Sequence, residues 1–379
     1  MEGSQEIPVF DLQVPQEDLD AVAETLSSGW WTMGPRVAEF ERAFADQLGC
    51  AEVVATSSCT AALHLSMLCA GVGEGDEVIV PSFTFVATAA AVLYTGATPV
   101  FADIVGQNDL GVDPDHVEEL LSERTKAVVT VHYAGYPAAV DRLERLCSER
   151  GLALIEDSAH APSATFDGRK LGTFGLAGAF SFFPNKVLAV GEGGALATDD
   201  EEVATRARAL RSHAMTTVTW ERHRGHALGY DVTDVGFNYR MDEPRAALLL
   251  SRLGRLEGEI ERRRAIVARY RAALQGLSGV TVPYLDEQVG QSSCFAMAVM
   301  VDDPEHRDEV RERMREQGVR TTVMYPGIHE FTAYRERFPG VSLPRTELAS
   351  RSQIALPLFS HMEDGQVDRV VEALEGALG

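Results

Sequence analysis

Cysteine is scarce in this sequence of 379 residues, and its few copies are widely spaced. An odd number of cysteines argues against a framework of disulfides, and no close pair is present that could hold a metal ion. We therefore expect reduced thiols in a cytoplasmic protein that binds no metal. The five cysteines are Cys50, Cys59, Cys69, Cys147 and Cys294.

Long apolar segments are also missing. Nowhere do eighteen uncharged apolar residues follow one another, which is about the length that crosses a bilayer. The opening segment MEGSQEIPVFDLQVPQED has no basic stretch followed by an apolar run, as a secretory signal would have. We expect neither secretion nor attachment to a membrane.

Positive charge is in short supply, with 34 Lys and Arg residues against 57 Asp and Glu residues, for a net charge of -23. Such a surface repels polyanions unless a local basic patch overrides the average. We therefore expect no nucleic-acid partner.

What the sequence does contain, from about residue 51 onward, is a regular alternation of short apolar segments with helical patterns. The alternation predicts an α/β fold with a mainly parallel sheet covered by helices on both faces. In such folds, functional loops gather at the carboxyl ends of the strands. The apolar segments are DEVIVP, TPVFADI, KAVVTVHYAG, LALIEDSAH, GAFSFFP and GGALATD.

The length of the chain exceeds that of one typical core, so two domains are expected. The segment 242–277 is long, amphipathic and charged on one face, which predicts a single helix leaving the large domain. We place a large domain at 1–250 and a smaller α+β domain at 251–379. The smaller domain contains a strand, CFAMAVMVDD, a helix, PEHRDEVRERMREQG, and a terminal helix from about Asp364.

One lysine lies among neighbours that are unusual for a surface residue. Lys186 occurs in SFFPNKVLAVGEGG, and the nearest charges along the chain are Lys170 and Glu192. A loop lysine usually extends its amine into water, so this position alone predicts only a surface residue. A functional interpretation needs partners from other loops.

Three other loops supply such partners. In TSSCTAALHLSML, the hydroxyls of Ser58 and Thr60 precede a helix that begins near Ala61, where they either cap the helix or bind a phosphate. Phe85 follows a strand end and could cover a planar ring. The strand in LIEDSAH ends with Asp157, an acid that needs a cationic partner if it is buried.

These features together fit pyridoxal 5'-phosphate (PLP). Its aldehyde requires a lysine amine, its pyridine nitrogen requires a carboxylate, and its phosphate requires a helix N-terminus. A nicotinamide cofactor does not fit, because no strand is followed by G-x-G-x-x-G and a later acidic residue. The nearest stretch, GEGGAL, lacks that spacing and runs into a strand.

Five motifs in order extend this hypothesis over nearly the whole chain: SGWWTMGPRVAEFE, EDSAHA, SFFPNK with GEGG, GFNYRM and MYPGIHE. In this order they resemble the DegT-type nucleotide-sugar aminotransferases (DegT/DnrJ/StrS), which have the aspartate-aminotransferase fold of PLP fold type I. The resemblance implies that Lys186 forms the Schiff base, that Asp157 pairs with the pyridine nitrogen, and that His160 hydrogen-bonds the 3-hydroxyl of the cofactor.

The resemblance also implies how the rest of the cofactor is held. Phe85 would stack on the ring, and Asn238 would reach the phosphate from a second subunit, which implies a homodimer with shared active sites. Cys59 stands where the family commonly has glycine, so the backbone there has less room near the phosphate. The phosphate contacts implied within the chain are Ser58, Cys59, Thr60 and Ser181.

The substrate side is less closely specified. Trp30, Trp31, Tyr325 and His329 are candidate walls of the sugar site. Arg240 and Arg320 are candidates to meet a donor carboxylate or a pyrophosphate.

The resemblance implies L-glutamate as amino donor and a nucleotide-linked keto sugar as acceptor. GEGG favours amination at carbon 4, as in a dTDP-4-keto-6-deoxyhexose, whereas GDGG accompanies amination at carbon 3 in this family. Four alternatives stay open: a sugar 3-aminotransferase, a cyclitol aminotransferase acting on a keto-inositol, a regulatory relative without turnover, and a structural binding module with Lys186 as a simple loop lysine.

Overall fold

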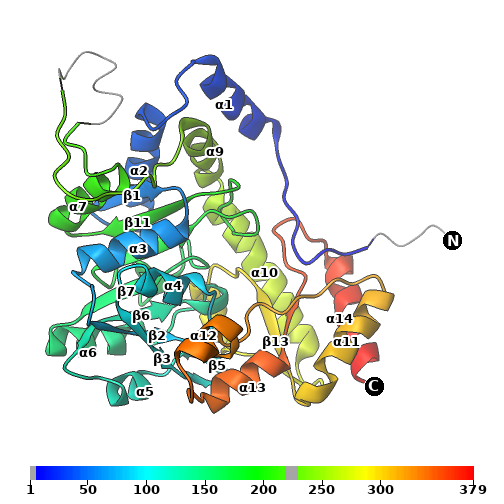
Figure 1. The fold of residues 1–379 in the computed structure, drawn as a ribbon. Helices are drawn as coiled ribbons and strands as arrows, with labels where there is room; N and C mark the ends of the chain where they lie inside the picture. The colour runs from blue at the N-terminus through cyan, green and yellow to red at the C-terminus, as the bar shows by residue number, and fades with distance from the viewer. Residues whose placement is uncertain (1–5, 218–228) are drawn as a thin grey trace.

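The computed structural model describes residues 6–217 and 229–379 (Figure 1). Its centre is a sheet of seven described strands in the order β1-β11-β10-β7-β6-β2-β3. Six of these strands run in one direction, and β11 pairs antiparallel with both of its neighbours. The predicted mainly parallel sheet is therefore confirmed. The strands are β1 (Glu52–Thr56), β2 (Glu77–Pro81), β3 (Thr98–Ala102), β6 (Thr125–Val131), β7 (Ala153–Asp157), β10 (Ala177–Ser181) and β11 (Gly194–Thr198).

Helices bury both faces of this sheet. On one face, Val54, Val80 and Val129 pack beneath α3 (Cys59–Cys69), α4 (Ala87–Leu93) and α7 (Glu201–Arg211). On the other face, Ile79 and Val128 pack against α5 (Pro114–Glu119) and α6 (Val140–Arg150), and α2 (Pro35–Leu48) covers the β1 end. Side chains of a strand alternate between its two faces, so strands buried on both faces are apolar almost throughout.

A second, antiparallel sheet lies in the C-terminal part and has the order β12-β13-β14. Helices pack against this sheet, and the strand and the two helices predicted for this region are confirmed. The elements are β12 (Val280–Thr281), β13 (Met297–Val301), β14 (Gln353–Leu356), α11 (Arg307–Glu316), α12 (Thr332–Arg337), α13 (Pro344–Ser352) and α14 (Asp364–Leu378). The short pairs β4 (Ile104–Gly106) with β5 (Asp109–Val112), and β8 (Thr165–Phe166) with β9 (Arg169–Lys170), complete the described strands.

The prediction of one continuous helix over 242–277 is wrong. The segment forms α9 (Glu243–Leu253) and α10 (Leu256–Leu274), which are separated at Gly254 and Arg255. The guanidinium of Arg255 binds both carboxylate oxygens of the buried Asp18, in α1 (Gln16–Ser27), at 2.8 and 2.7 Å. A buried carboxylate needs such a partner, and this ion pair fixes the corner between the two helices.

The division into domains at residue 250 stays a proposal. Residues from before that position also pack against the C-terminal part: Ile7 forms a parallel bridge with Val319, and its N–H donates to the carbonyl of Gly318 at 2.9 Å. No helix of the described residues is long and apolar enough to cross a bilayer.

Candidate functional site

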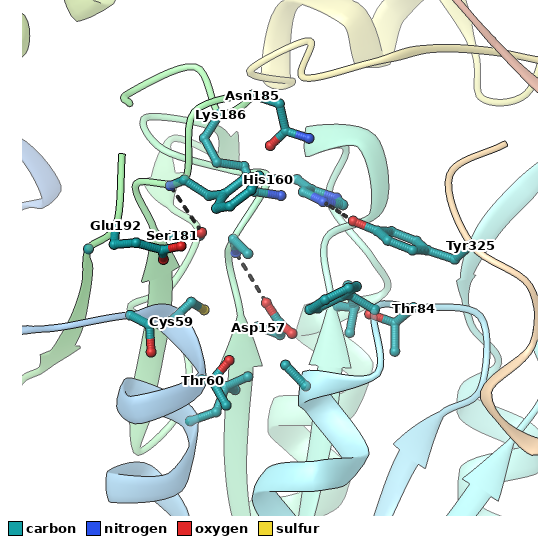
Figure 2. Close-up of a pocket in the computed structure, with 18 residues that line it drawn as sticks. Cys59, Thr60, Thr84, Asp157, His160, Ser181, Asn185, Lys186, Glu192 and Tyr325 are labelled. Carbon is teal, nitrogen blue, oxygen red and sulfur yellow. Dashed lines mark hydrogen bonds between the residues drawn. The ribbon is translucent and has the colours of Figure 1, made fainter. Parts of the chain in front are cut away.

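A cavity of about 390 Å³ opens at the carboxyl edge of the large sheet (Figure 2). The loops after β1, β2, β7 and β10 meet there, as the parallel topology requires. Nine of the side chains singled out from the sequence line this one cavity. They are Ser58, Cys59, Thr60, Phe85, Asp157, His160, Ser181, Lys186 and Tyr325.

Lys186 lies in the turn that follows β10, and its side chain points into the cavity (Figure 2). The residue is buried, and burial lowers the pKa of its amine from 10.5 to about 8, although the nearby Cys59 and Asp157 oppose the shift. Desolvation disfavours the ammonium form, so a substantial share of the amine is neutral at slightly alkaline pH. A neutral lysine amine is a nucleophile and a base.

Asp157 is the last residue of β7, and its carboxylate faces the cavity from below (Figure 2). The hydroxyl of Thr88 donates to Oδ2 at 2.8 Å, and the N–H of Ala159 donates to Oδ1 at 3.2 Å. Burial raises the pKa of Asp157 despite these hydrogen bonds. A buried carboxylate with one donor on each oxygen still has capacity to bind a cation in the cavity.

The neighbouring acid, Glu156, has a different role. Successive strand residues point to opposite faces, and the carboxylate of Glu156 accepts hydrogen bonds from the N–H groups of Gly172, Phe174 and Gly175 at 2.6 to 2.9 Å. Nε2 of His132 lies 3.0 Å from the same carboxylate. Glu156 therefore holds a turn beneath the sheet, and of these two adjacent acids Asp157 is the one that lines the cavity.

His160 presents a neutral imidazole to the cavity wall. Burial and the nearby Lys186 hold its pKa well below the ordinary value of 6.5. Its Nε2 lies 3.0 Å from the hydroxyl of Tyr325, whereas its buried Nδ1 has no hydrogen-bond partner among the described residues. The buried Oδ1 of Asn185, which also lines the cavity, has no partner there either. Buried polar atoms without partners are rare, so both atoms fit a polar ligand.

The N-terminus of α3 forms one wall of the cavity. Ser58 caps the helix by accepting a hydrogen bond from the N–H of Ala61 at 3.1 Å, and Thr60 lies in the first turn. A Cβ on Gly194 would lie 2.3 Å from the carbonyl carbon of Ser58, so this glycine allows the helix to start directly against β11. The first turn of a helix, with its free N–H groups and positive dipole end, favours an anion.

Cys59 introduces no charge at this wall. Burial raises the pKa of its thiol well above 9.0, so the sulfur stays protonated and neutral beside the helix N-terminus. A phosphate bound there would meet no repulsion from a thiolate.

These residues fit PLP. The cavity combines an amine with a lowered pKa, a buried carboxylate, an aromatic ring in Phe85, a helix N-terminus and two polar atoms that lack partners. Each is a group that one part of the cofactor requires.

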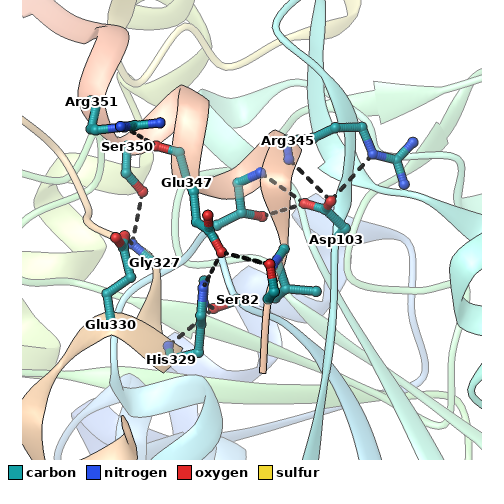
Figure 3. A network of polar contacts seen from close by, with 12 residues as sticks. Ser82, Asp103, Gly327, His329, Glu330, Arg345, Glu347, Ser350 and Arg351 are labelled. Atoms are coloured by element: carbon teal, nitrogen blue, oxygen red, sulfur yellow. Dashed lines mark hydrogen bonds and ion pairs between the residues drawn. The ribbon is translucent and has the colours of Figure 1, made fainter. Parts of the chain in front are cut away.

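Two of the predicted substrate residues do not line the cavity. The side chain of Trp31 is 58% exposed, and its Nε1 donates to the carbonyl of Leu26 at 2.9 Å. His329 is buried, with Nδ1 at 2.7 Å from Oγ of Ser82 and Nε2 at 3.3 Å from Oε1 of Glu347 (Figure 3). His329 therefore joins the loop after β2 to α13 and is not a wall of the cavity.

Three further predicted residues also lie outside this cavity. Asn238 is exposed and forms an antiparallel bridge with Ser212, and Arg240 is half-buried. Arg320 forms an ion pair with Glu6 at 2.5 Å. It lines an adjoining cavity of about 540 Å³, which shares Asn185 and Tyr325 with the first.

Sequence reasoning missed five side chains that contact the site. Two of them, Asn185 and Glu192, lie in the sequence segment that contains Lys186. Two others, Thr84 and Thr88, lie in the segment that contains Phe85. Their closeness in sequence to a predicted site residue was the signal that could have identified them. Phe295 has no such signal, because it belongs to the C-terminal part and approaches Lys186 only in the folded chain.

Comparisons with known proteins identify the family of this chain. Residues 13–375 match the model of the DegT/DnrJ/EryC1/StrS aminotransferase family. The chain is 38% identical, over 95% of its length and 94% of the relative's, to the spore coat polysaccharide biosynthesis protein SpsC of Bacillus subtilis.

Two solved structures are similar over nearly their full length. The aminotransferase TlmJ of Streptoalloteichus hindustanus matches with a TM-score of 0.91 and 38% identity, over 98% of this chain and 99% of TlmJ. DesV of S. venezuelae matches with a TM-score of 0.91 and 35% identity, over 99% of each chain. The chain therefore belongs to the DegT/DnrJ/EryC1/StrS family of PLP-dependent sugar aminotransferases.

Proposed function

We propose that this aminotransferase moves an amino group from L-glutamate to a nucleotide-linked keto sugar. The favoured acceptor is a dTDP-4-keto-6-deoxyhexose, which would be aminated at carbon 4. One observation carries the catalytic part of the proposal: the buried amine of Lys186, with its lowered pKa, shares one cavity with the buried carboxylate of Asp157.

In this proposal, different residues of the chain have different roles in the reaction. When bound, PLP supplies an electron sink that stabilises negative charge on the carbon being deprotonated. Asp157, which accepts a hydrogen bond from Thr88, would supply the negative charge that pairs with the ring nitrogen. The neutral Nζ of Lys186 takes a proton from the substrate carbon and returns it, which requires a pKa near the working pH. Ser58, Thr60 and Ser181 would hold the phosphate, and Nδ1 of His160 would meet the ring hydroxyl.

The substrate assignment is supported by the relatives and by the space around the site. The neighbour PseC of Helicobacter pylori is described as involved in pseudoaminic acid biosynthesis, and SpsC in that of a spore coat polysaccharide. The adjoining cavity of about 540 Å³ offers room for the part of the acceptor distant from the reacting carbon. The GEGG stretch of this chain, whose Glu192 lines the catalytic cavity, favours amination at carbon 4.

We also propose a cytoplasmic homodimer with shared sites. Asn238 is exposed and lies outside the cavity of its own chain, which is consistent with a contact to the cofactor phosphate of a second subunit. Arg240, two residues later, would meet a donor carboxylate or a pyrophosphate from the same direction.

The test separates the two half-reactions. Protein loaded with PLP is mixed with L-glutamate, and the visible absorbance of the cofactor bound through Lys186 should be lost. A dTDP-linked 4-keto sugar should then restore the absorbance, whereas a 3-keto isomer and a keto-inositol should not. Lys186→Arg, which keeps the charge but offers no suitable amine, is the control that should show neither change.

Each other outcome identifies an alternative. Restoration by the keto-inositol alone would establish a cyclitol aminotransferase, and restoration by the 3-keto sugar alone would establish amination at carbon 3. No response to any amino donor would favour a regulatory relative without turnover.

A further inference from the structure

Phe295, in the C-terminal part of the chain, lines the adjoining cavity and contacts two side chains of the catalytic cavity. The centre of its ring lies 4.4 Å from Nζ of Lys186. The same ring stacks on the imidazole of His160, with centres 4.0 Å apart and planes 12° from parallel. We propose that Phe295 is a positioning residue of the reactive amine, which holds Nζ of Lys186 against its face and fixes the plane of the His160 ring.

Hydrogen bonds attach the segment before this ring to the loops of the large sheet. The N–H of Phe295 donates to the carbonyl of Ala134 at 3.0 Å, and the N–H of Ser293 donates to the carbonyl of Gly135 at 3.2 Å. The hydroxyl of Ser293 donates to the carbonyl of His160 at 2.5 Å. The segment that carries Phe295 is therefore bound to the same loop that carries His160.

Backbone conformation on both sides of this contact is unusual. Ala134 has a φ of +56° and Cys294 a φ of +50°, which is the left-handed region that side chains other than glycine seldom occupy. Gly135, with a φ of +89°, allows a close approach, because a Cβ there would lie 2.2 Å from Oγ of Ser293. Such conformations persist where the surrounding structure fixes them, and they gather at functional sites. Here they bring the ring of Phe295 to the amine.

The ring has a specific electrostatic effect on Lys186. An aromatic face attracts a cation, and the attraction grows when water is excluded. The titratable groups around the amine are Asp157 and Cys59, and His160, Glu192 and Tyr325 also line the cavity. Against the burial that disfavours the ammonium form, the ring of Phe295 favours it. A leucine of similar size would fill the space without this attraction.

The test uses the full chain freed of cofactor and measures how fast Lys186 captures added PLP as a function of pH, followed by visible absorbance. Capture requires the neutral amine, so the midpoint of the profile reports the titration of Lys186. In Phe295→Leu we expect this midpoint to move to lower pH by about half a unit or more. Phe295→Tyr keeps the ring face and should retain the wild-type midpoint.

A matched control removes a different buried ring from the C-terminal part. Phe359 is buried and lines neither of the two adjoining cavities, so Phe359→Leu should leave the midpoint unchanged. The proposal is overturned if folded Phe295→Leu protein keeps the wild-type midpoint, or if Phe295→Tyr shifts it as far as Phe295→Leu does. Should the leucine variant fail to fold, Phe295→Met removes the ring at similar volume and is judged by the same two outcomes.

This inference depends on Lys186 as the amine that binds the cofactor, and the measurement involves no acceptor. A failure of the acceptor assignment would therefore leave it untouched. Wild-type protein that captures no PLP would contradict the proposed function itself.

Discussion

Thr88 donates its hydroxyl hydrogen to Oδ2 of Asp157 across 2.8 Å, and both side chains are buried. The hydroxyl belongs to α4 and the carboxylate to the end of β7, so the bond joins a helix to the end of a strand. Because it stabilises the charged form, it opposes the burial that raises the pKa of Asp157. Thr88 thus helps to keep the acid ionised.

Replacing Thr88 with valine should raise the pKa of Asp157 further, because the variant keeps the shape of the side chain but loses the donor. A hydrogen bond to a charged group contributes about 1.5 to 3 kcal/mol, so we expect turnover to fall roughly tenfold or more. The acid limb of the pH–rate profile should move to higher pH, and Thr88→Ser should restore it. A profile unchanged in Thr88→Val would show that the bond has no effect on Asp157.

Exchange of Lys186 for methionine should stabilise the cofactor-free protein at neutral pH. In the wild type, the pKa of Lys186 is lowered from 10.5 in the unfolded chain to about 8 in the fold. Below pH 8 the folded protein therefore contains a buried ammonium group, which destabilises it. The stability of wild type should therefore rise with pH from about 8 to 10.5, while the variant gains nothing there.

The difference in free energy of unfolding should be on the order of 3 kcal/mol at pH 7 and should close above the upper pKa. Urea denaturation of both proteins at several pH values measures this. A difference that stays constant from pH 7 to 11 would show that the amine is not desolvated in the fold.

The two adjacent acids of β7 should respond differently to removal of their charge. Asp157→Asn should still bind PLP but lose about 100-fold or more in turnover, as expected when a charge that acts on the transition state is removed. Glu156→Gln should mainly lower stability, because its carboxylate anchors three backbone N–H groups. Turnover, cofactor affinity and melting temperature of both variants distinguish the two roles. Near-normal turnover of Asp157→Asn would mean that the acid of the cavity was wrongly assigned.

His329 should matter for stability more than for substrate binding. Changing it to alanine removes the imidazole that joins Ser82 to Glu347, which costs about 1 to 3 kcal/mol. The KM for glutamate should stay near wild type.

The comparison variant is Tyr325→Phe, which removes a hydroxyl from the cavity and should change the KM for glutamate with little loss of stability. A large increase in KM for a stable His329→Ala protein would place His329 in the substrate site after all.

A complementation experiment tests the proposed shared site. The two inactive variants are Lys186→Ala and Asn238→Asp, whose added carboxylate should repel the cofactor phosphate. In a mixed homodimer, one site would contain both defects and the other neither, so about half the activity of a wild-type dimer should return. No recovery, despite subunit exchange verified by mass spectrometry, would show that Asn238 serves its own chain or does not contact the cofactor.

The site could be predicted from the sequence where functional residues lie directly after strands. Asp157 and Ser181 end β7 and β10, and parallel topology brings such ends together, so order along the chain determines proximity in space. The reversal of β11 and the break between α9 and α10 were not visible in the pattern. The break between the two helices depends on a buried ion pair between Arg255 and Asp18. Asp18 is distant in sequence, so the local pattern around Arg255 does not predict this pair.

The same limit explains why some residues predicted for the substrate side lie outside the catalytic cavity. His329 lies in a motif that suggests a site, yet its contacts with Ser82 and Glu347 come from elements distant in sequence. Phe295 shows the reverse: its local sequence resembles the start of an ordinary core strand, and only tertiary structure brings it to Lys186. The role of a side chain that depends on such long-range contacts cannot be predicted from the local sequence pattern.

The reversed strand β11 has a consequence for how the site can change. Because β11 runs against its neighbours, its first residue and not its last lies at the carboxyl edge, next to the start of α3. The turn that contains Glu192 and Gly193 therefore enters the cavity before the strand begins, with Lys186 at the other end of the same short connection. An insertion or deletion between Lys186 and Gly194 would move the amine relative to the phosphate-binding wall, whereas point substitutions at Glu192 would alter only the lining. The connection between Lys186 and Gly194 can therefore change its side chains but must keep its length.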